Sequence, residues 1–186
     1  SGNVGPFAVQ IAKAFGAHVT GVARTSKLDL VREVGADAVI DYTKEPLSAH
    51  ARRFDGAFDL VGGATLMSMF ACVRRGGRIV SIAGVPEIRT ALVDVKKPLL
   101  APLFLLVGAA PSVKGLVNGV DYRFLLMRPD GAQLAELVAL VDSGVLPVTL
   151  DREFPLARIA EAFEYLERGH AKGKVVVRIA GPDSGS

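Results

Sequence analysis

Short apolar runs alternate with helical patterns through the first half of this 186-residue chain. The runs, which we expect to be strands, cover residues 18–23, 36–41, 56–63 and 78–84. Between them, apolar residues recur at helical spacing, as over residues 4–15 and 64–73. Strands that alternate with helices pair in parallel through right-handed crossovers. The pattern therefore predicts an α/β fold whose parallel sheet is covered on both faces, because its strands are almost continuously apolar.

The second half begins with a less regular region, residues 86–119, which contains four prolines and a long apolar stretch. Residues 120–127 then predict a strand. The segment after Asp130 predicts a helix that this residue caps and Gly144 ends. The last predicted elements are a helix over residues 155–169 and a strand that begins at residue 173. We expect one domain over residues 1–180 and a disordered tail over residues 181–186.

Composition and charge exclude several classes of partner. The net charge is +3, with acids and bases interspersed, and no dense cluster of Lys and Arg predicts a nucleic-acid surface. The longest apolar stretch, residues 98–110, is too short to span a bilayer and predicts no membrane partner. The single cysteine, Cys72, excludes an internal disulfide, and with no recognisable signal peptide it predicts a cytoplasmic protein. The three histidines show no metal-ligand spacing, so no metal is expected.

A glycine step opens the chain ahead of the first helical pattern. Gly2, Asn3, Val4 and Gly5 match the last part of the dinucleotide fingerprint G-x-G-x-x-G. Glycines there let the backbone approach a pyrophosphate, and the following helix points N–H groups and its positive dipole end at the phosphates. A structural turn without a ligand is the alternative for so short a motif. The α/β alternation that follows favours dinucleotide binding.

The turn after the first predicted strand carries cations where an NAD site carries an acid. NAD-binding sheets place Asp or Glu about 20 residues after the glycines, where it binds the ribose 2′-hydroxyl. No acid occurs between Gly16 and Lys27, and Arg24, Thr25 and Ser26 stand where the acid would be. A cationic, hydroxyl-rich turn suits a 2′-phosphate, so the sequence predicts NADPH rather than NADH. The alternative is a solvated turn in which Ser26 caps the next helix, which would run to about residue 34.

These residues, in this order, resemble the cofactor-binding half of the medium-chain dehydrogenase/reductase family, and within it the zinc-independent quinone oxidoreductases. The matching stretches are SGNVGPFAVQIAKAFGAHVTGV, LVREVGADAVIDYTKE, FDLVGGATL, RRGGRIVSIAG and DREFPLARIAEAFEYLERGHAKGKVVV. The resemblance covers nearly the whole chain and is weakest over residues 86–118. It implies a Rossmann-type doubly wound parallel sheet that lacks its first strand. In the family a GroES-like catalytic domain precedes this sheet, so we expect the chain to be a fragment.

The resemblance also implies which residues meet the cofactor. Gly2, Asn3, Val4 and Gly5 would hold the pyrophosphate. The residues at the adenosine end would be Arg24, Ser26 and Lys27 at the 2′-phosphate and Tyr42 beside the adenosine phosphate. The residues that would line the nicotinamide end are Val61, Gly62, Ala83, Gly84, Phe124 and Leu125. For Tyr42, Phe124 and Leu125, ordinary packing is the alternative, and Lys174 reads as the solvated start of a strand.

The implied function is that of an NADPH-binding module of an oxidoreductase that passes hydride to a quinone, an enone or a similar carbonyl or alkene. A cofactor domain of a zinc-dependent alcohol dehydrogenase and a non-catalytic nucleotide-sensing domain are the alternatives. The sequence offers no catalytic constellation, so no catalytic residue is named and no turnover is expected from this chain alone. The resemblance further implies a homodimer through residues 120–127. Residues 99–107 would cover the nicotinamide or form a subunit contact, with a buried helix as the alternative.

Overall fold

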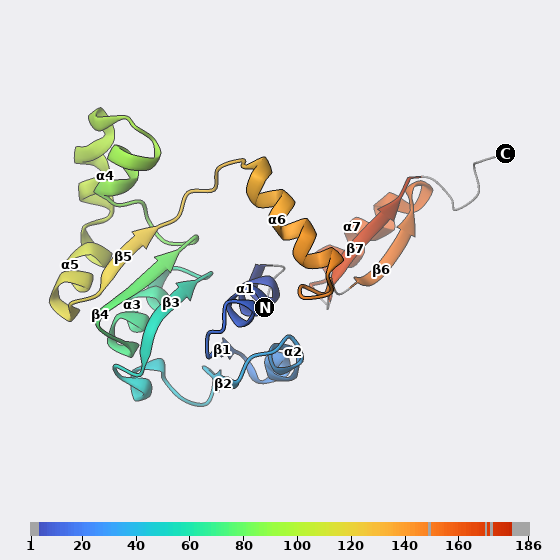
Figure 1. Ribbon diagram of the computed structural model, residues 1–186, viewed down its shortest axis with the longest axis horizontal. Coiled ribbons are helices and arrows are strands. Elements are labelled where there is room, and N and C mark those ends of the chain that lie inside the picture. Colours follow the sequence, from blue (N-terminus) through green and yellow to red (C-terminus); the bar gives the residue numbers. More distant parts are fainter. Residues whose placement is uncertain (1–3, 149, 170, 172, 180–186) are drawn as a thin grey trace. The chain divides into compact units, whose positions relative to one another are not determined.

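The computed structural model describes residues 4–148, 150–169, 171 and 173–179 (Figure 1). The chain divides into two compact units. Unit 1 consists of Ser1–His18 and Asp130–Ser186, and unit 2 of Val19–Pro129. The assignment of residues 1–180 to one domain stays a prediction, and the predicted tail lies outside the described residues.

Unit 2 contains two parallel sheets. In the smaller sheet, β1 (Thr20–Ala23) pairs with β2 (Ala38–Asp41), and the larger has the order β3 (Phe54–Asp59), β4 (Val73–Ser81) and β5 (Asp121–Phe124). A doubly wound sheet has the order 3-2-1-4-5-6. In that order, β2 and β1 correspond to strands 3 and 2, which are neighbours. The strands β3, β4 and β5 correspond to strands 4, 5 and 6, which are also neighbours. The predicted α/β fold with parallel strands is therefore confirmed.

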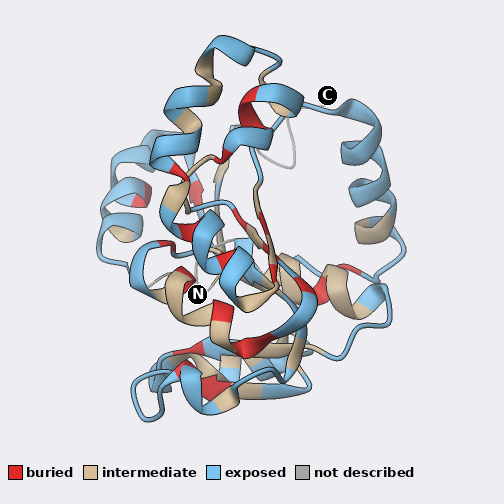
Figure 2. Ribbon diagram, turned by 90° about the vertical axis from the view of Figure 1, so that its left-hand side faces the viewer, coloured by how far each residue is buried: buried red, intermediate tan, exposed pale blue. Residues whose placement is uncertain are grey.

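Helices connect these strands as the alternation predicted. The helices of unit 2 are α2 (Leu28–Glu33), α3 (Gly63–Cys72), α4 (Ala101–Val107) and α5 (Ala109–Asn118). Short helical turns complete the connections: η1 (Thr25–Lys27), η2 (Leu47–His50), the π-helical η3 (Thr90–Asp94) and η4 (Pro98–Leu100). Buried positions form only short stretches of the chain, and exposed positions cover most of the helices (Figure 2).

The core of the larger sheet lies where α3 and α5 pack on β4 and β5. Phe70 of α3 and Ile79 of β4 are fully buried, together with Val73 between them in the chain. A Cβ on Gly115 of α5 would lie 2.7 Å from the carbonyl oxygen of Val120, so only glycine allows this helix to approach the strand so closely. The strand predicted over residues 78–84 begins five residues earlier and ends at Ser81.

The irregular region after β4 is fastened to β5 by buried charges. Glu87, 3% exposed, accepts a hydrogen bond from the Arg123 guanidinium at 2.8 Å. The same guanidinium donates to Asp94 at 2.6 Å, and Arg89 pairs with Asp121. A buried carboxylate needs such partners, because desolvation without them is costly. The network therefore holds the chain that follows the carboxyl end of β4 against β5.

Helices α4 and α5 expose much apolar surface. Leu106 of α4 and Leu116 of α5 are 75% and 83% exposed, Leu99 in the preceding turn η4 is 91% exposed, and no residue of α4 is buried. The alternative that this region forms an ordinary buried helix is therefore wrong. No single described helix is long and apolar enough to cross a bilayer; residues 98–107 and 109–118, bent by 71°, have that length and composition only as a pair.

Unit 1 holds the ends of the described chain. Its elements are α1 (Val4–Ala14), α6 (Gly131–Asp142), η5 (Leu156–Arg158), α7 (Ile159–Glu167) and the parallel pair β6 (Leu150–Pro155) and β7 (Lys174–Arg178). The predicted cap is confirmed, because the Asp130 carboxylate accepts the N–H groups of Ala132 and Gln133 at 3.0 and 3.1 Å. The Lys174 ammonium lies 5.1 Å from the ring centroid of Phe7, so this strand start packs on α1.

Candidate cofactor-binding site

The turn after β1 presents the side chains predicted to meet a 2′-phosphate. Arg24 follows the strand directly and is exposed, as is Ser26, whereas Lys27 is half-buried. Among the described residues, neither Arg24 nor Lys27 has an ion-pair partner. Their charges are therefore available to an anion at the carboxyl end of β1. The nearest following acid, Asp29, is paired with Arg32 on α2 at 2.8 Å.

The predicted capping role of Ser26 is wrong. Helix α2 begins at Leu28, and no side chain caps it. A 3-10 turn, η1, precedes it, and the Thr25 hydroxyl in that turn donates to Asp41 of the neighbouring strand. This bond to β2 holds the turn, and the Leu28 N–H at the start of the helix donates to the Thr25 carbonyl oxygen in the same turn. Ser26 keeps an exposed hydroxyl that a ligand can reach.

Asp41 joins the turn after β1 to the turn after β2. It is the last residue of β2, is 8% exposed, and accepts the Thr43 hydroxyl at 2.6 Å and the Thr43 N–H at 3.0 Å in addition to Thr25. The Lys44 ammonium lies 3.8 Å away. The hydrogen bonds from Thr25 and then Thr43 lower the pKa of Asp41 below its ordinary value. Tyr42, which lies between Asp41 and Thr43 in the sequence, is 55% exposed.

The carboxyl ends of β3 and β4 bring four of the predicted nicotinamide residues together. Asp59 ends β3, Ser81 ends β4, and the two are register partners with no exposed surface. A Cβ on Gly62, where φ is +74°, would lie 2.2 Å from the carbonyl oxygen of Ala83. The turn with Val61 and Gly62 therefore touches the turn with Ala83 and Gly84. This is the edge of a parallel sheet where ligands of α/β proteins bind.

Phe124 and Leu125 differ in their surroundings at the end of β5. Phe124 is half-buried and packs against the core cluster around Phe70, which is the ordinary packing given as its alternative. Leu125 is 49% exposed, and its N–H donates to the Ser81 carbonyl oxygen at 2.8 Å. Only Leu125 of this pair thus offers a side chain to a ligand.

The residues predicted at the pyrophosphate belong to the other unit. Gly2 and Asn3 lie outside the described residues. Val4 and Gly5 form the first turn of α1, and Val4 is 49% exposed. Their role stays a prediction.

The described residues do not fit a metal site. Residues 4–148, 150–169, 171 and 173–179 contain no group of three or more His, Cys, Asp or Glu that could hold a metal ion. Cys72 is buried on α3 and its thiol donates to the Leu47 carbonyl oxygen at 3.0 Å. Burial raises the pKa of this thiol, which suits a packed side chain rather than a metal ligand or a nucleophile.

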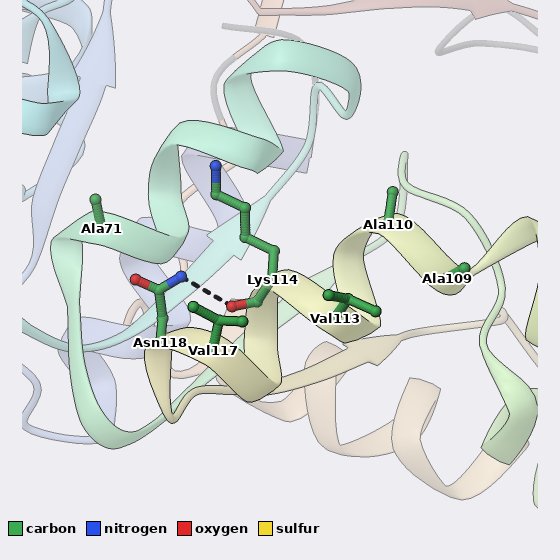
Figure 3. A pocket seen from close by; sticks show the side chains of 7 residues that line it. All are labelled: Ala71, Ala109, Ala110, Val113, Lys114, Val117 and Asn118. Carbon is green, nitrogen blue, oxygen red and sulfur yellow. Dashed lines mark hydrogen bonds between the residues drawn. The ribbon is translucent and has the colours of Figure 1, made fainter.

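A shallow hollow of about 720 Å³ lies on the helical side of unit 2 (Figure 3). It is lined by Ala71 of α3 and by Ala109, Ala110, Val113, Lys114, Val117 and Asn118 of α5. The Asn118 amide donates to the carbonyl oxygen of Lys114 at 2.8 Å, which caps the end of α5. None of the predicted cofactor residues lines this hollow, so it is not the predicted site.

Asp41, Asp59 and Ser81 are the residues that sequence reasoning missed. Each is the last residue of a strand, and each is buried although it is polar. The available signal was an acid that closes an apolar run directly before a turn, as in the stretches AVIDYT and FDLVGG. Such an acid has to find hydrogen-bond donors in the sheet, because an unpaired buried carboxylate is costly.

Comparison with known proteins relates the chain to a group of oxidoreductases. The family model described as zinc-binding dehydrogenase matches residues 34–177. The mitochondrial NAD(P)H oxidoreductase RTN4IP1 of Mus musculus is 37% identical over 96% of this chain and 46% of that protein. The chloroplastic NADPH-dependent alkenal/one oxidoreductase of Arabidopsis thaliana is 32% identical over 95% of this chain and 38% of that protein. The quinone oxidoreductase of Coxiella burnetii superposes with a TM-score of 0.71, at 27% identity, over 96% of this chain and 50% of that one.

These relatives correct one expectation. The predicted cytoplasmic location is wrong, because the relatives with 32–37% identity are named as mitochondrial or chloroplastic proteins. A single unpaired cysteine argues against an oxidising compartment but does not separate the cytoplasm from organelles. The chain spans about half the length or less of the relatives it matches.

Proposed function

Because the chain belongs to the zinc-binding dehydrogenase family, we propose that it is the NADPH-binding module of an oxidoreductase. The substrate class we propose is a quinone, an enone or a similar carbonyl or alkene. The names of the relatives, an alkenal/one oxidoreductase and a quinone oxidoreductase among them, support that class. No residue of this chain is assigned to zinc, since the described residues contain no group that could hold a metal ion.

The observation on which the proposal depends is the cationic turn after β1. Arg24 and Lys27 have no ion-pair partner within the described chain, and Ser26 keeps an exposed hydroxyl beside them. Charge-assisted hydrogen bonds from such groups bind a phosphate, whereas a ribose with a free 2′-hydroxyl would gain little from them. Asp41 supports the arrangement by holding Thr25, so the turn is fixed before a ligand arrives.

In this reading the protein binds and orients, and the cofactor supplies the reacting group. NADPH, when bound, supplies a hydride at its nicotinamide ring. Val61, Gly62, Ala83 and Gly84 would meet the nicotinamide half, and their small or apolar side chains would keep water from it. No residue of this chain is assigned to proton transfer.

The experiment compares NADPH with NADH on the 186-residue chain by isothermal titration calorimetry. We expect the wild type to prefer NADPH, and the variant Arg24→Ala/Lys27→Ala to lose that preference by about tenfold or more, because each charged hydrogen bond contributes about 1.5–3 kcal/mol. The matched control Arg74→Ala/Lys114→Ala changes the net charge equally and should keep the preference. Absence of binding to both nucleotides would contradict the proposal, as would an unchanged preference in the first variant.

We also propose that two copies of the chain pair through residues 120–127. Strand β5 lies at one edge of the larger sheet, and Leu125 and Leu126 beyond it are 49% and 41% exposed. An edge strand can pair with a second copy through the N–H and carbonyl groups of its open edge. In β5 the Tyr122 carbonyl oxygen also accepts a hydrogen bond from Arg89 at 2.8 Å. Light scattering after size exclusion should give twice the mass of the chain, and a monomeric mass would contradict the pairing.

A further inference from the structure

The last residues of β3 and β4 form a buried polar pair. Asp59 and Ser81 both have no exposed surface, and the Ser81 hydroxyl donates to the Asp59 carboxylate at 2.5 Å. Among the described residues no cation pairs with Asp59. Its hydrogen bonds are therefore all to uncharged groups, and each of them belongs to the ends of these two strands.

The Asp59 and Ser81 side chains accept hydrogen bonds from the N–H groups of four residues. The Asp59 carboxylate accepts the N–H of Val61 at 3.1 Å and the N–H of Gly62 at 3.0 and 3.1 Å. The Ser81 oxygen accepts the N–H groups of Ala83 at 3.2 Å and Gly84 at 2.7 Å. These four are the residues predicted to line the nicotinamide. Their N–H groups all point into the protein, onto one connected hydrogen-bond system.

A third strand fixes the same region. The Tyr122 hydroxyl of β5 donates to the Val85 carbonyl oxygen at 2.8 Å, directly after Gly84. A Cβ on Gly84 would lie 2.5 Å from that hydroxyl and 2.8 Å from the Ser81 oxygen. The backbone beyond β4 therefore has little freedom to turn its N–H groups outward.

This arrangement decides which ligand chemistry the edge can recognise. A backbone turn binds an anion through free N–H groups, and here those groups are taken. What Val61, Ala83 and Gly84 can offer a ligand is carbonyl oxygens and apolar surface, whereas the carbonyl oxygen of buried Gly62 accepts the Leu66 N–H at 3.2 Å. Such an edge suits hydrogen-bond donors, such as ribose hydroxyls and a carboxamide NH₂, and disfavours a phosphate.

We propose that Asp59 and Ser81 are positioning residues, which hold Val61, Gly62, Ala83 and Gly84 as a hydrogen-bond-accepting edge for the nicotinamide riboside half of NADPH. The inference rests on the proposed function, because it takes NADPH as the ligand. It adds that the protein distinguishes the two ends of the cofactor: the turn after β1 donates hydrogen bonds to the 2′-phosphate, and the edge after β3 and β4 accepts them from the nicotinamide riboside. A purely structural role for the pair is the competing explanation.

A ligand that lacks the nicotinamide half separates the two explanations. Adenosine 2′,5′-bisphosphate contains the 2′-phosphate and the adenosine of NADPH but no nicotinamide riboside. The full 186-residue chain is titrated with NADPH and with this ligand by calorimetry, as wild type, Asp59→Asn and Ser81→Ala. Asp59→Asn keeps the size of the side chain and replaces one acceptor with a donor, and Ser81→Ala removes the link between the turns. The control Ser68→Ala removes a hydroxyl that bonds only within α3, to the Thr65 carbonyl oxygen at 2.8 Å.

We expect both variants to weaken NADPH by about tenfold while the bisphosphate changes by less than about twofold, as the loss of one ligand contact would produce. The emission of bound NADPH should also shift back toward that of free NADPH in the variants and stay unchanged in Ser68→Ala. Equal weakening of both ligands, or unchanged NADPH affinity in a folded variant, would overturn the inference and favour a structural role. If Asp59→Asn fails to fold, Ser81→Ala alone decides between these outcomes. Absence of NADPH binding by the wild type would overturn the proposed function, and the inference with it.

Discussion

Two strand ends of unit 2 use the same hydrogen-bonding device with different neighbours. Asp41 ends β2 and Asp59 ends β3, and each accepts the N–H of the residue two positions later, at 3.0 and 3.1 Å. Each also accepts a hydroxyl from the neighbouring strand end, Thr25 for Asp41 and Ser81 for Asp59. In both places a carboxylate ties two adjacent turns at the carboxyl edge of a parallel sheet.

The difference lies in what surrounds each carboxylate. Asp41 is close to the surface, with Lys44 at 3.8 Å and the unpaired charges of Arg24 and Lys27 on the turn that it holds. Asp59 is fully buried, and the turns that it holds carry only small or apolar side chains. The same backbone arrangement therefore produces a cationic surface at one strand end and an uncharged, hydrogen-bond-accepting one at the other. In the proposed function, flanking side chains, rather than the carboxylate, would therefore determine which part of NADPH each strand end meets.

The largest expected effect on the free energy of unfolding comes from replacing the carboxylates Asp59 and Asp41 with alanine. Asp59→Ala leaves three donors without a partner, of which the Gly62 N–H and the Ser81 hydroxyl are buried and the Val61 N–H is partly buried. Each unsatisfied buried donor costs about 1–3 kcal/mol, so we expect the free energy of unfolding to fall by about 3–4 kcal/mol in total. Asp41→Ala should cost clearly less, because exposed Thr25 and Thr43 can bond to water.

Urea unfolding followed by circular dichroism measures both losses. An Asp41→Ala loss as large as that of Asp59→Ala would show that burial does not distinguish the two strand ends. The two carboxylates would then contribute equally to the free energy of unfolding.

The contact between the turns after β3 and β4 gives the next largest effect. Gly62→Ala introduces a Cβ 2.2 Å from the Ala83 carbonyl oxygen at a residue with φ of +74°. We expect a loss of about 2–3 kcal/mol in the free energy of unfolding, from strain and overlap together. Gly63→Ala is the matched control, because Gly63 also has a positive φ, +54°, but has no atom within 4 Å of its Cβ position.

The control should lose only about 1 kcal/mol, the cost of a left-handed residue. Equal losses in the two variants would mean that the turns can move apart. The edge proposed for the nicotinamide would then not be rigid.

The sequence predicted the elements whose causes are local. Gly16, with φ of +79°, follows α1, and Asp130 caps α6, because a helix end depends on a few adjacent residues. The alternation of strands and helices likewise predicted parallel pairing. Ser26 was mistaken for a cap because the turn η1 precedes α2, and the bond that holds this turn, Thr25 to Asp41, joins residues 16 positions apart. That bond exists only once β1 and β2 have paired.

The buried pair at the nicotinamide edge could not be predicted in the same way. Asp59 and Ser81 are 22 positions apart, and their contact depends on the register of β3 on β4. The two glycines that follow Asp59 by three and four positions in the stretch FDLVGG suggest a turn, but not which hydroxyl the acid meets. The sequence also left open whether residues 99–107 are buried or exposed. An apolar sequence alone does not say whether a partner element covers it.

The smallest expected effect concerns protonation of Asp41 at the end of β2. The Thr25 hydrogen bond contributes most to the lowered pKa of Asp41, followed by Thr43, and the charge of Lys44 contributes least. Thr25→Val should therefore raise the pKa of Asp41 toward its ordinary value, and Lys44→Ala should raise it less. Thr25→Ser keeps the hydroxyl and serves as the control. Carboxyl carbon NMR during an acid titration measures the pKa in each variant.

The sign of the stability change follows from the direction of the pKa shift. A carboxylate whose pKa is lowered by folding contributes stability at pH values above its unfolded pKa, and this is lost as the pH falls through the folded pKa. Thr25→Val should therefore destabilise the chain near neutral pH and lose that effect in acid. A larger rise of the Asp41 pKa in Lys44→Ala than in Thr25→Val would mean that charge, rather than the hydroxyl, holds this turn. The two strand ends would then share the backbone N–H bonds to their carboxylates, but not the dependence on a hydroxyl from the neighbouring turn.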